Sequence, residues 1–203
     1  RVTGQEGGRQ LTLEVTAPDT FASETSCDIR DLAALEAALE ATPPEFIFHL
    51  AAQPLVRLSY EEPLETLMTN VLGTAHVLEA VRRLKLNCRV LVVTSDKCYE
   101  NDGGDQLFAE GDSLGGADVY SATKAATELV AHSWRQSFYD RDACLGPMVT
   151  ARAGNVIGGG DYAGDRIVPD AVRALMAGKA VPVRNPAAVR PWQHVIDCLS
   201  GYL

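Results

Sequence analysis

The sequence predicts an α/β fold built on a doubly wound parallel sheet. Short apolar runs indicate strands, and the stretches between them carry apolar residues every three or four positions, which is the helical period. The expected strands are 45–50, 89–94 and 148–151, and the expected helices are 32–39, 63–85 and 119–138. Such alternation is typical of a parallel sheet with helical crossovers.

Each element has its own local signal. The helix from residue 32 ends at Thr42-Pro43-Pro44, because proline cannot continue a helix. The run 45–50 has helices on either side along the chain, so we expect a strand buried on both faces. The helix over 63–85 carries its apolar stripe at Leu64, Leu67, Met68, Val71, Leu72, Ala75, Leu78 and Val81.

Two domains are expected. After Arg152 the sequence changes to a glycine cluster at 158–160 and one further short helix. We therefore expect a first domain over 1–152 and the start of a smaller lobe over 153–203. The stretch 100–118 follows a strand and contains six acidic residues, five glycines and no basic residue. A connection of this length is often functional, and ligands bind at the carboxyl ends of the strands in open α/β sheets.

The composition excludes several classes of protein. A net charge of −9 argues against nucleic acid as a partner, and no apolar stretch approaches the length of a membrane helix. No secretory signal is visible, and five scattered cysteines suit reduced thiols in the cytoplasm rather than a disulfide framework or a metal site. The chain opens on Arg1 and closes inside an apolar segment, so we expect a piece of a longer protein.

The strongest local motif is Tyr120-Ser121-Ala122-Thr123-Lys124, which opens an expected helix. Residues four apart lie on one helical face, so the Lys124 ammonium can approach the Tyr120 phenol and favour the phenolate. A phenolate can take a proton from a sugar hydroxyl. Considered by its spacing alone, the pair is more often ordinary helix surface.

A second motif ends the strand 89–94. Ser95 can donate a hydrogen bond to a substrate oxygen, Asp96 can deliver a proton, and Lys97 can accept one. A solvated turn with a salt bridge explains these residues equally well.

Two further motifs are weaker. His49-Leu50-Ala51-Ala52-Gln53 ends another strand, where small residues let a ligand approach the backbone; His49 itself favours a packed or hydrogen-bonded role. Asp28, before a helix, can cap that helix or receive an adenine amino group.

Taken together, these motifs resemble the extended short-chain dehydrogenase/reductase family, and within it the nucleotide-sugar 4,6-dehydratases. The resemblance covers about residues 27–203. It rests on the following phrases: His49-Leu50-Ala51-Ala52-Gln53-Pro54-Leu55-Val56-Arg57, Asn70-Val71-Leu72-Gly73-Thr74, Thr94-Ser95-Asp96-Lys97-Cys98-Tyr99-Glu100-Asn101, Arg152-Ala153-Gly154-Asn155-Val156-Ile157-Gly158-Gly159-Gly160-Asp161 and Arg190-Pro191-Trp192-Gln193-His194. Lys97 follows Asp96 where dTDP-glucose dehydratases carry Glu, which is similar to the branch that uses CDP-glucose.

The resemblance implies a Rossmann-like domain and a redox-neutral, NAD-dependent loss of water from CDP-glucose. Tyr120 would take the C4 hydroxyl proton with Lys124 holding the ribose, and Ser95 would bind the C4 oxygen. Lys97, or a group that it orients, would remove the C5 proton while Asp96 protonates the departing C6 hydroxyl.

The resemblance also implies binding residues in both domains. Residues 1–152 would bind NAD, through Asp28, Ile29, Leu50, Ala51, Ala52, Gln53, Asn70, Thr94, Tyr120 and Lys124. The lobe would hold the diphosphate or its nucleotide, through Asn155, Arg166 and Arg190. For Asn70, a purely structural hydrogen bond is an equal alternative. Family members commonly dimerise through two helices, here those near 64–85 and 119–138, whose stripes could belong to the core instead.

One departure from the family concerns its glycine-rich phosphate loop. Gly4 and Gly7 fit only the first half of that loop, and too few residues separate Gly7 from Asp28 for a helix and a second strand. We therefore expect residues 1–4 to be the second strand, the true loop to lie upstream, and the chain by itself to bind NAD weakly.

Two other functions compete with a dehydratase. A nucleotide-sugar 4-epimerase, or another sugar-nucleotide oxidoreductase, would share the Tyr/Lys pair without needing an acid and a base at Asp96 and Lys97. A non-catalytic NAD-binding protein would tolerate the loss of Tyr120 and Lys124, which are both present.

Overall fold

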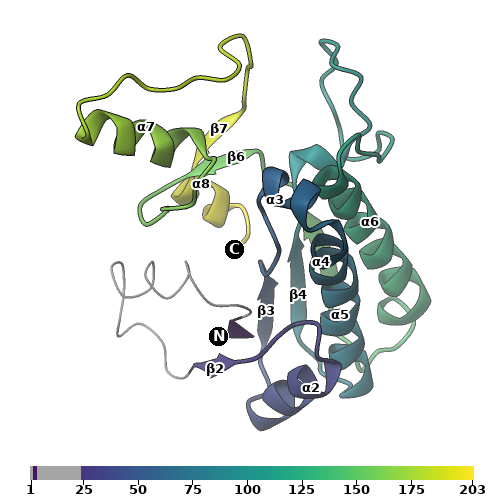
Figure 1. The fold of residues 1–203 in the computed structure, drawn as a ribbon. Coiled ribbons are helices and arrows are strands. Elements are labelled where there is room, and N and C mark those ends of the chain that lie inside the picture. Colours follow the sequence, from purple (N-terminus) through teal and green to yellow (C-terminus); the bar gives the residue numbers. More distant parts are fainter. Residues whose placement is uncertain (1, 4–23) are drawn as a thin grey trace. The chain divides into compact units, whose positions relative to one another are not determined.

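The computed structural model describes residues 2–3 and 24–203, which divide into two compact units. The first contains residues 2–3 and 24–153, and the second contains residues 154–203 (Figure 1). The glycines at positions 4 and 7 lie outside the described residues.

The first unit is built on a parallel sheet of three strands in the order β3-β4-β5. Its strands are β3 (Phe46–His49), β4 (Arg89–Val93) and β5 (Met148–Ala151). Ile47 pairs with Val90, and Val92 pairs with Thr150. The same unit holds a parallel pair, β1 (Val2–Thr3) and β2 (Thr25–Ser26), so a strand is found at residues 2–3 within the expected stretch 1–4. The expectation that this strand is the second of the main sheet stays a prediction.

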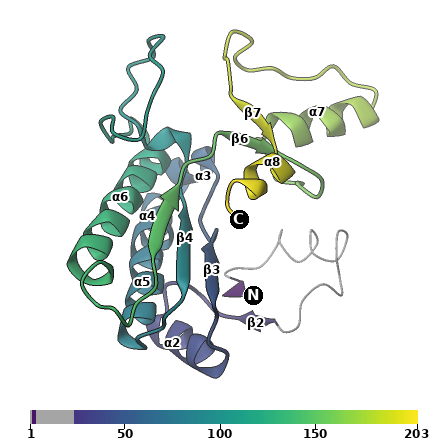
Figure 2. The ribbon, with the colours of Figure 1, turned by 180° about the vertical axis from the view of Figure 1, so that it is seen from behind.

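Helices α4, α5 and α6 cover one face of the three-stranded sheet (Figures 1 and 2). The helical elements are α2 (Leu32–Ala41), α3 (Val56–Glu61), α4 (Pro63–Leu67), the π-helical turn η1 (Met68–Leu72), α5 (Gly73–Arg83), the 3₁₀ turn η2 (Asp96–Cys98), α6 (Val119–Trp134) and the π-helical turn η3 (Arg135–Tyr139). The core is formed where Leu78 and Val81 of α5 pack on Val90 and Val92 of β4. None of the helices in the described part of the chain is both long and apolar enough to cross a membrane.

The expectation that β3 is buried on both faces is wrong. Phe46 is 50% exposed and Phe48 is 41% exposed, whereas His49 is buried. The reason is the pleat, because successive side chains point to opposite faces and only one face of this strand packs against helices α2 and α5.

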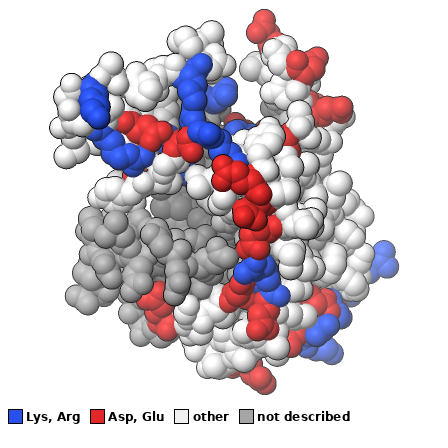
Figure 3. Space-filling view, in the orientation of Figure 1, with Lys and Arg blue, Asp and Glu red and all other residues white. Residues whose placement is uncertain are grey.

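The two ends of the stretch 100–118 are held together close to the turn η2. The Gly115 amide donates to the Cys98 carbonyl at 2.9 Å, and the Glu100 amide donates to the Ser113 carbonyl at 2.9 Å. Between these two hydrogen bonds the chain projects from the unit (Figure 1), and its sequence carries acidic but no basic residues, which appear as separate red groups in Figure 3.

The second unit contains a parallel pair of strands and two helices. These are β6 (Asn155–Ile157), α7 (Ile167–Met176), β7 (Trp192–His194) and α8 (Val195–Ser200). In the register of the pair, Asn155 lies opposite Trp192, and the Asn155 amide donates to the Pro191 carbonyl at 3.1 Å.

Candidate active site

Ser95, Asp96 and Lys97 form a tight turn directly after β4. The Ser95 hydroxyl donates to Asp96 Oδ1 at 3.0 Å and accepts from the Lys97 amide at 3.2 Å. The Asp96 amide donates to the Ala153 carbonyl at 3.0 Å, which ties the turn to the segment after β5. The turn is therefore held at the carboxyl ends of two neighbouring strands, where reacting groups collect in such sheets.

Tyr120 and Lys124 lie in the first two turns of α6. The helix begins at Val119 because the Asp118 carboxylate caps it, accepting from the Ser121 amide at 2.9 Å and from the Ser121 hydroxyl at 2.6 Å. Tyr120 is 8% exposed, and the Lys97 ammonium lies 6.0 Å from the centre of its ring. The fold thus brings the turn after β4 and the start of α6 together.

Lys124 is a buried cation. Its side chain is 6% exposed, and its ammonium donates to the Val93 carbonyl at 3.4 Å. Burial lowers the pKa of Lys124 to about 8, and the opposite charge of Glu128 limits the fall of that pKa. At neutral pH the ammonium is therefore charged but poorly solvated, which suits binding to a ligand hydroxyl.

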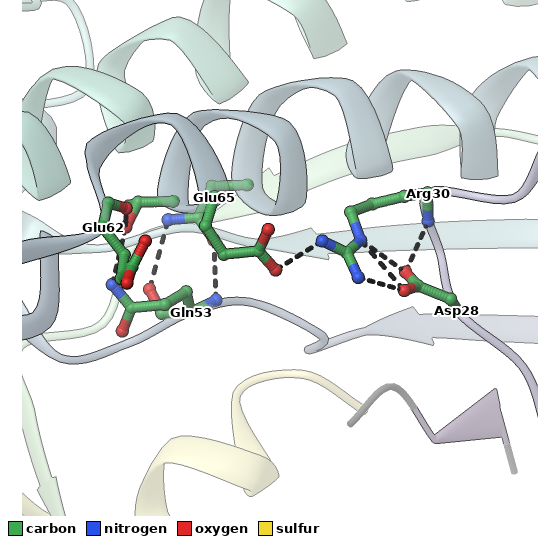
Figure 4. Close-up of polar contacts among 7 residues, drawn as sticks. Asp28, Arg30, Gln53, Glu62 and Glu65 are labelled. Carbon is green, nitrogen blue, oxygen red and sulfur yellow. Dashed lines mark hydrogen bonds and ion pairs between the residues drawn. The ribbon is translucent and has the colours of Figure 1, made fainter. Parts of the chain in front are cut away.

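Asp28 is held by Arg30 in the loop before α2 (Figure 4). The Arg30 Nε donates to both Asp28 oxygens at 2.9 Å, and a second nitrogen of the same guanidinium pairs with Glu65 of α4. The hydrogen bond from Arg30 lowers the pKa of Asp28, so the carboxylate stays an acceptor. Asp31, rather than Asp28, caps α2, since Asp31 accepts from the Ala34 amide at 3.0 Å.

Ile29, next to Asp28, is buried against α5. A Cβ on Gly73 would lie 2.5 Å from Ile29 Cδ1, so the glycine is what permits this approach. The Ile29 carbonyl lies 3.2 Å from His76 Nδ1, which fixes the loop from a second side.

Asn70 clamps the segment that follows β3. Its Oδ1 accepts from the Gln53 amide at 2.8 Å, and its Nδ2 donates to the Gln53 carbonyl at 3.2 Å and to Thr123 Oγ1 at 3.0 Å. The Gln53 side chain donates in turn to Thr66 Oγ1 at 2.9 Å (Figure 4). Asn70 thus makes structural hydrogen bonds that join Gln53 to α6, and its role in binding NAD stays a prediction.

The candidate substrate-binding residues lie in the second unit. Asn155 opens β6, and Arg190 precedes β7, so the two strands bring them close in the chain's fold. Arg166 is the N-cap residue of α7, but its side chain makes no capping hydrogen bond. The guanidinium pairs instead with the Asp161 carboxylate at 3.1 Å. Arg190 is exposed and donates to the Val189 carbonyl at 2.8 Å.

Two polar residues near Lys124 were missed as site residues. Glu128 is 5% exposed on α6, and it pairs with Arg152 at 3.1 Å. The four-residue spacing from Lys124 to Glu128 was the available sequence signal. His49, by contrast, is packed as expected, with its Nε2 2.9 Å from Thr74 Oγ1, and burial lowers its pKa to about 4.

Comparison with known sequences identifies relatives of the chain. The profile of the family described as GDP-mannose 4,6 dehydratase matches residues 14–203. A CDP-glucose 4,6-dehydratase of Salmonella typhimurium is 47% identical over 180 residues, covering 87% of this chain and 50% of the relative. The chain spans about half the length of the curated relatives it matches.

Solved structures share the fold. A dTDP-glucose 4,6-dehydratase of Streptomyces venezuelae, crystallised with NAD, is 27% identical with a TM-score of 0.78, covering 91% of this chain and 55% of that one. A UDP-glucuronic acid 4-epimerase of Bacillus cereus is 20% identical with a TM-score of 0.81, covering 99% and 62%. With the parallel sheet described above, these likenesses show a Rossmann-like α/β fold.

Proposed function

Because the chain belongs to the family described as GDP-mannose 4,6 dehydratase, we propose that a protein containing residues 1–203 removes water from a nucleotide-linked hexose with NAD. The substrate proposed is CDP-glucose, and the product is CDP-4-dehydro-6-deoxyglucose. The observation that carries the proposal is the juxtaposition of Ser95, Asp96 and Lys97 with Tyr120 at one edge of the sheet. The relative at 47% identity supports CDP-glucose over other sugar nucleotides.

The donor set of the first unit fits NAD. The ionised Asp28 carboxylate suits an adenine amino group, and the poorly solvated Lys124 ammonium suits the hydroxyls of a ribose. Thr94 directly follows β4, next to Val93, whose carbonyl accepts from Lys124. Leu50, Ala51, Ala52 and Gln53 follow β3, so these residues would line the rest of the cofactor.

Three of the side chains at the edge would then move protons, and Ser95 would hold the C4 oxygen. NAD, when bound, supplies a hydride acceptor for C4 and afterwards a hydride donor for C6. Tyr120 takes the C4 hydroxyl proton, while Ser95 donates a hydrogen bond to the same oxygen. Lys97, or a group it orients, takes the C5 proton and later returns it. Asp96 protonates the C6 hydroxyl, which leaves as water, and the proton taken by Tyr120 balances the one that Asp96 gives.

The second unit would hold the nucleoside diphosphate. Arg166 and Arg190 supply charge-assisted hydrogen bonds to phosphate, and Asn155 supplies an amide next to Arg190 in the fold. The Arg166–Asp161 ion pair would have to open or be shared when the phosphate binds.

The protein is also proposed to act as a homodimer in the cytoplasm, within polysaccharide biosynthesis. Apolar side chains on α4 and η1 support the dimer, because Leu64 is 74% exposed and Leu67, Met68 and Leu72 are half-exposed beside it. On α6, Leu129 is 59% exposed. A second copy would cover these side chains.

The test is to incubate the protein with NAD and CDP-glucose and to follow the sugar nucleotide by mass spectrometry. Loss of one water from CDP-glucose, but not from dTDP-glucose or UDP-glucose in parallel, is expected. Isomerisation without a change in mass would instead indicate an epimerase. Binding of NAD without any conversion would indicate a non-catalytic protein.

A further inference from the structure

Glu128 is a buried carboxylate that the chemistry above does not use. Thr94 donates its hydroxyl to one carboxylate oxygen, and Thr150 donates to the other at 2.9 Å. Arg152 donates to that second oxygen at 3.1 Å. A carboxylate this deeply placed is costly unless it is paired, so three donors converge on it from the ends of β4 and β5.

Glu128 and Arg152 join three parts of the first unit. Glu128 belongs to α6, which packs against β5 (Figure 2), and Arg152 follows β5 directly. The Arg152 guanidinium also lies 4.9 Å from the centre of the Tyr99 ring and donates to the Glu110 carbonyl at 3.1 Å. The ion pair therefore links the helix that carries Tyr120 to Tyr99 and to the acidic stretch 100–118.

Lys124 lies one turn before Glu128 on the same helix. Burial pushes its ammonium towards the neutral amine, and the Glu128 carboxylate opposes that effect. Arg152, which pairs with Glu128 at 3.1 Å, neutralises part of the same carboxylate charge. Other titratable groups near it include Tyr120 on its own helix, His49 on β3 and Cys98 on η2. Burial keeps His49 neutral at physiological pH and raises the pKa of Cys98 to about 11, so neither supplies a full negative charge. Among the described groups that act on Lys124, Glu128 is the ionised anion.

We propose that Glu128 is a positioning residue which keeps the Lys124 ammonium charged, and that Arg152 sets how much of the Glu128 charge reaches it. The inference rests on the proposed function for the role of Lys124, since a neutral Lys124 would neither favour the Tyr120 phenolate nor bind a ribose as a cation. The charge state of Lys124 itself depends on residues of this chain and can be measured without NAD or substrate.

Two substitutions should act in opposite directions. Glu128→Gln removes the anion, so the pKa of Lys124 should fall by about one pH unit or more. Arg152→Gln leaves the Glu128 carboxylate in place and removes the cation that pairs with it. More of the carboxylate charge then acts on Lys124, so the pKa of Lys124 should rise. A role limited to packing would not produce shifts of opposite sign.

The measurement is an NMR titration of the protein labelled at lysine ¹³Cε, without substrate. The Lys124 resonance is assigned by its absence in Lys124→Arg. Glu79→Gln is the matched control, because Glu79 also pairs with two arginines, Arg82 and Arg83, but lies on α5 beside neither Lys124 nor Glu128. That control should leave the Lys124 titration unchanged even where it lowers stability.

Shifts of opposite sign in the two variants would establish the inference. Shifts of the same sign, or none, would overturn it. Glu128→Asp, which keeps the negative charge, replaces Glu128→Gln if the latter fails to fold. The pKa of Lys124 is then expected to stay near the wild-type value in Glu128→Asp and to rise in Arg152→Gln. In the water-loss assay, the alkaline limb of the pH profile should follow the same shifts. Opposite NMR shifts without any turnover would retain the inference and reject the proposed function.

Discussion

Replacing Lys124 by methionine should make the protein more stable at pH 7 while removing its activity. Lys124 is 6% exposed, so its ammonium has lost most of its hydration in the folded state. Methionine has a similar length and no charge to desolvate. The site would thereby lose the cation on which the proposed chemistry depends.

The size of the gain follows from the pKa. Burial lowers the pKa of Lys124 from 10.5 to about 8. Each pKa unit corresponds to about 1.4 kcal/mol between the two protonation states, so the charged form costs about 3 kcal/mol in the folded protein. The hydrogen bond to the Val93 carbonyl at 3.4 Å is long and offsets little of this gain.

The pH dependence has a definite sign. Below about pH 8, Lys124 is protonated in both the folded and the unfolded state, and the full cost is present. Between about pH 8 and 10.5 the unfolded state binds more protons, so the stability of the wild type rises with pH. The difference between the wild type and Lys124→Met should therefore shrink across this window.

The assay is urea unfolding of both proteins at pH 7 and at steps up to pH 10. NAD is left out, because a ligand that binds only the folded state would stabilise the wild type selectively. Lys97→Met serves as the control, since Lys97 is only half-buried and should change stability by less than about 1 kcal/mol. A variant no more stable than the wild type at pH 7, or a gap that stays constant with pH, would refute the reasoning.

Three further predictions can be checked directly. Tyr120→Phe should lower turnover by about 100- to 10,000-fold while calorimetry finds NAD affinity nearly unchanged; a parallel loss of affinity would contradict the assigned role. Asp96→Asn should slow the loss of water more than the exchange of the C5 proton with D₂O, both followed by mass spectrometry, and equal slowing would count against Asp96 as the acid. Gly146→Ala would place a Cβ 2.2 Å from the Cys88 carbonyl oxygen and should cost about 1–3 kcal/mol in urea unfolding, whereas Gly159→Ala, which meets open space, should cost much less.

The strands and long helices could be predicted because their signals are local. The apolar runs at β3, β4 and β5 and the apolar stripe over 63–85 depend only on nearby residues. Helix α3 was not predicted, because its six residues form fewer than two turns and are too few to show the helical period. The exposure of Phe46 was not predicted either, because it depends on which face of the sheet the helices cover.

The candidate site was predictable in its motifs but not in its supports. Tyr120 and Lys124 share a helical face by spacing alone, and the structure adds the turn after β4 beside them. The partnership of Glu128 with Thr94 and Arg152 joins residues 34 and 24 positions apart, so no local pattern reveals it. The sequence therefore predicted the groups proposed to react, together with Thr94 and Asn70, but not Glu128 or its pairing with Arg152.

The spacing between Asn70 in the π-helical turn η1 and the core residues of α5 constrains the length of the chain. Asn70 sits in this turn and grips Gln53, while Leu78 and Val81 farther along the same helical stretch fill the core. Removing one residue from α5 between Gly73 and Val77 would rotate Leu78 and Val81 by about 100° relative to Asn70, since an α-helix has 3.6 residues per turn. Either Asn70 would then lose its hydrogen bonds to Gln53, or Leu78 and Val81 would turn away from the core. The number of residues between them is thus fixed as strictly as the identity of any one of them.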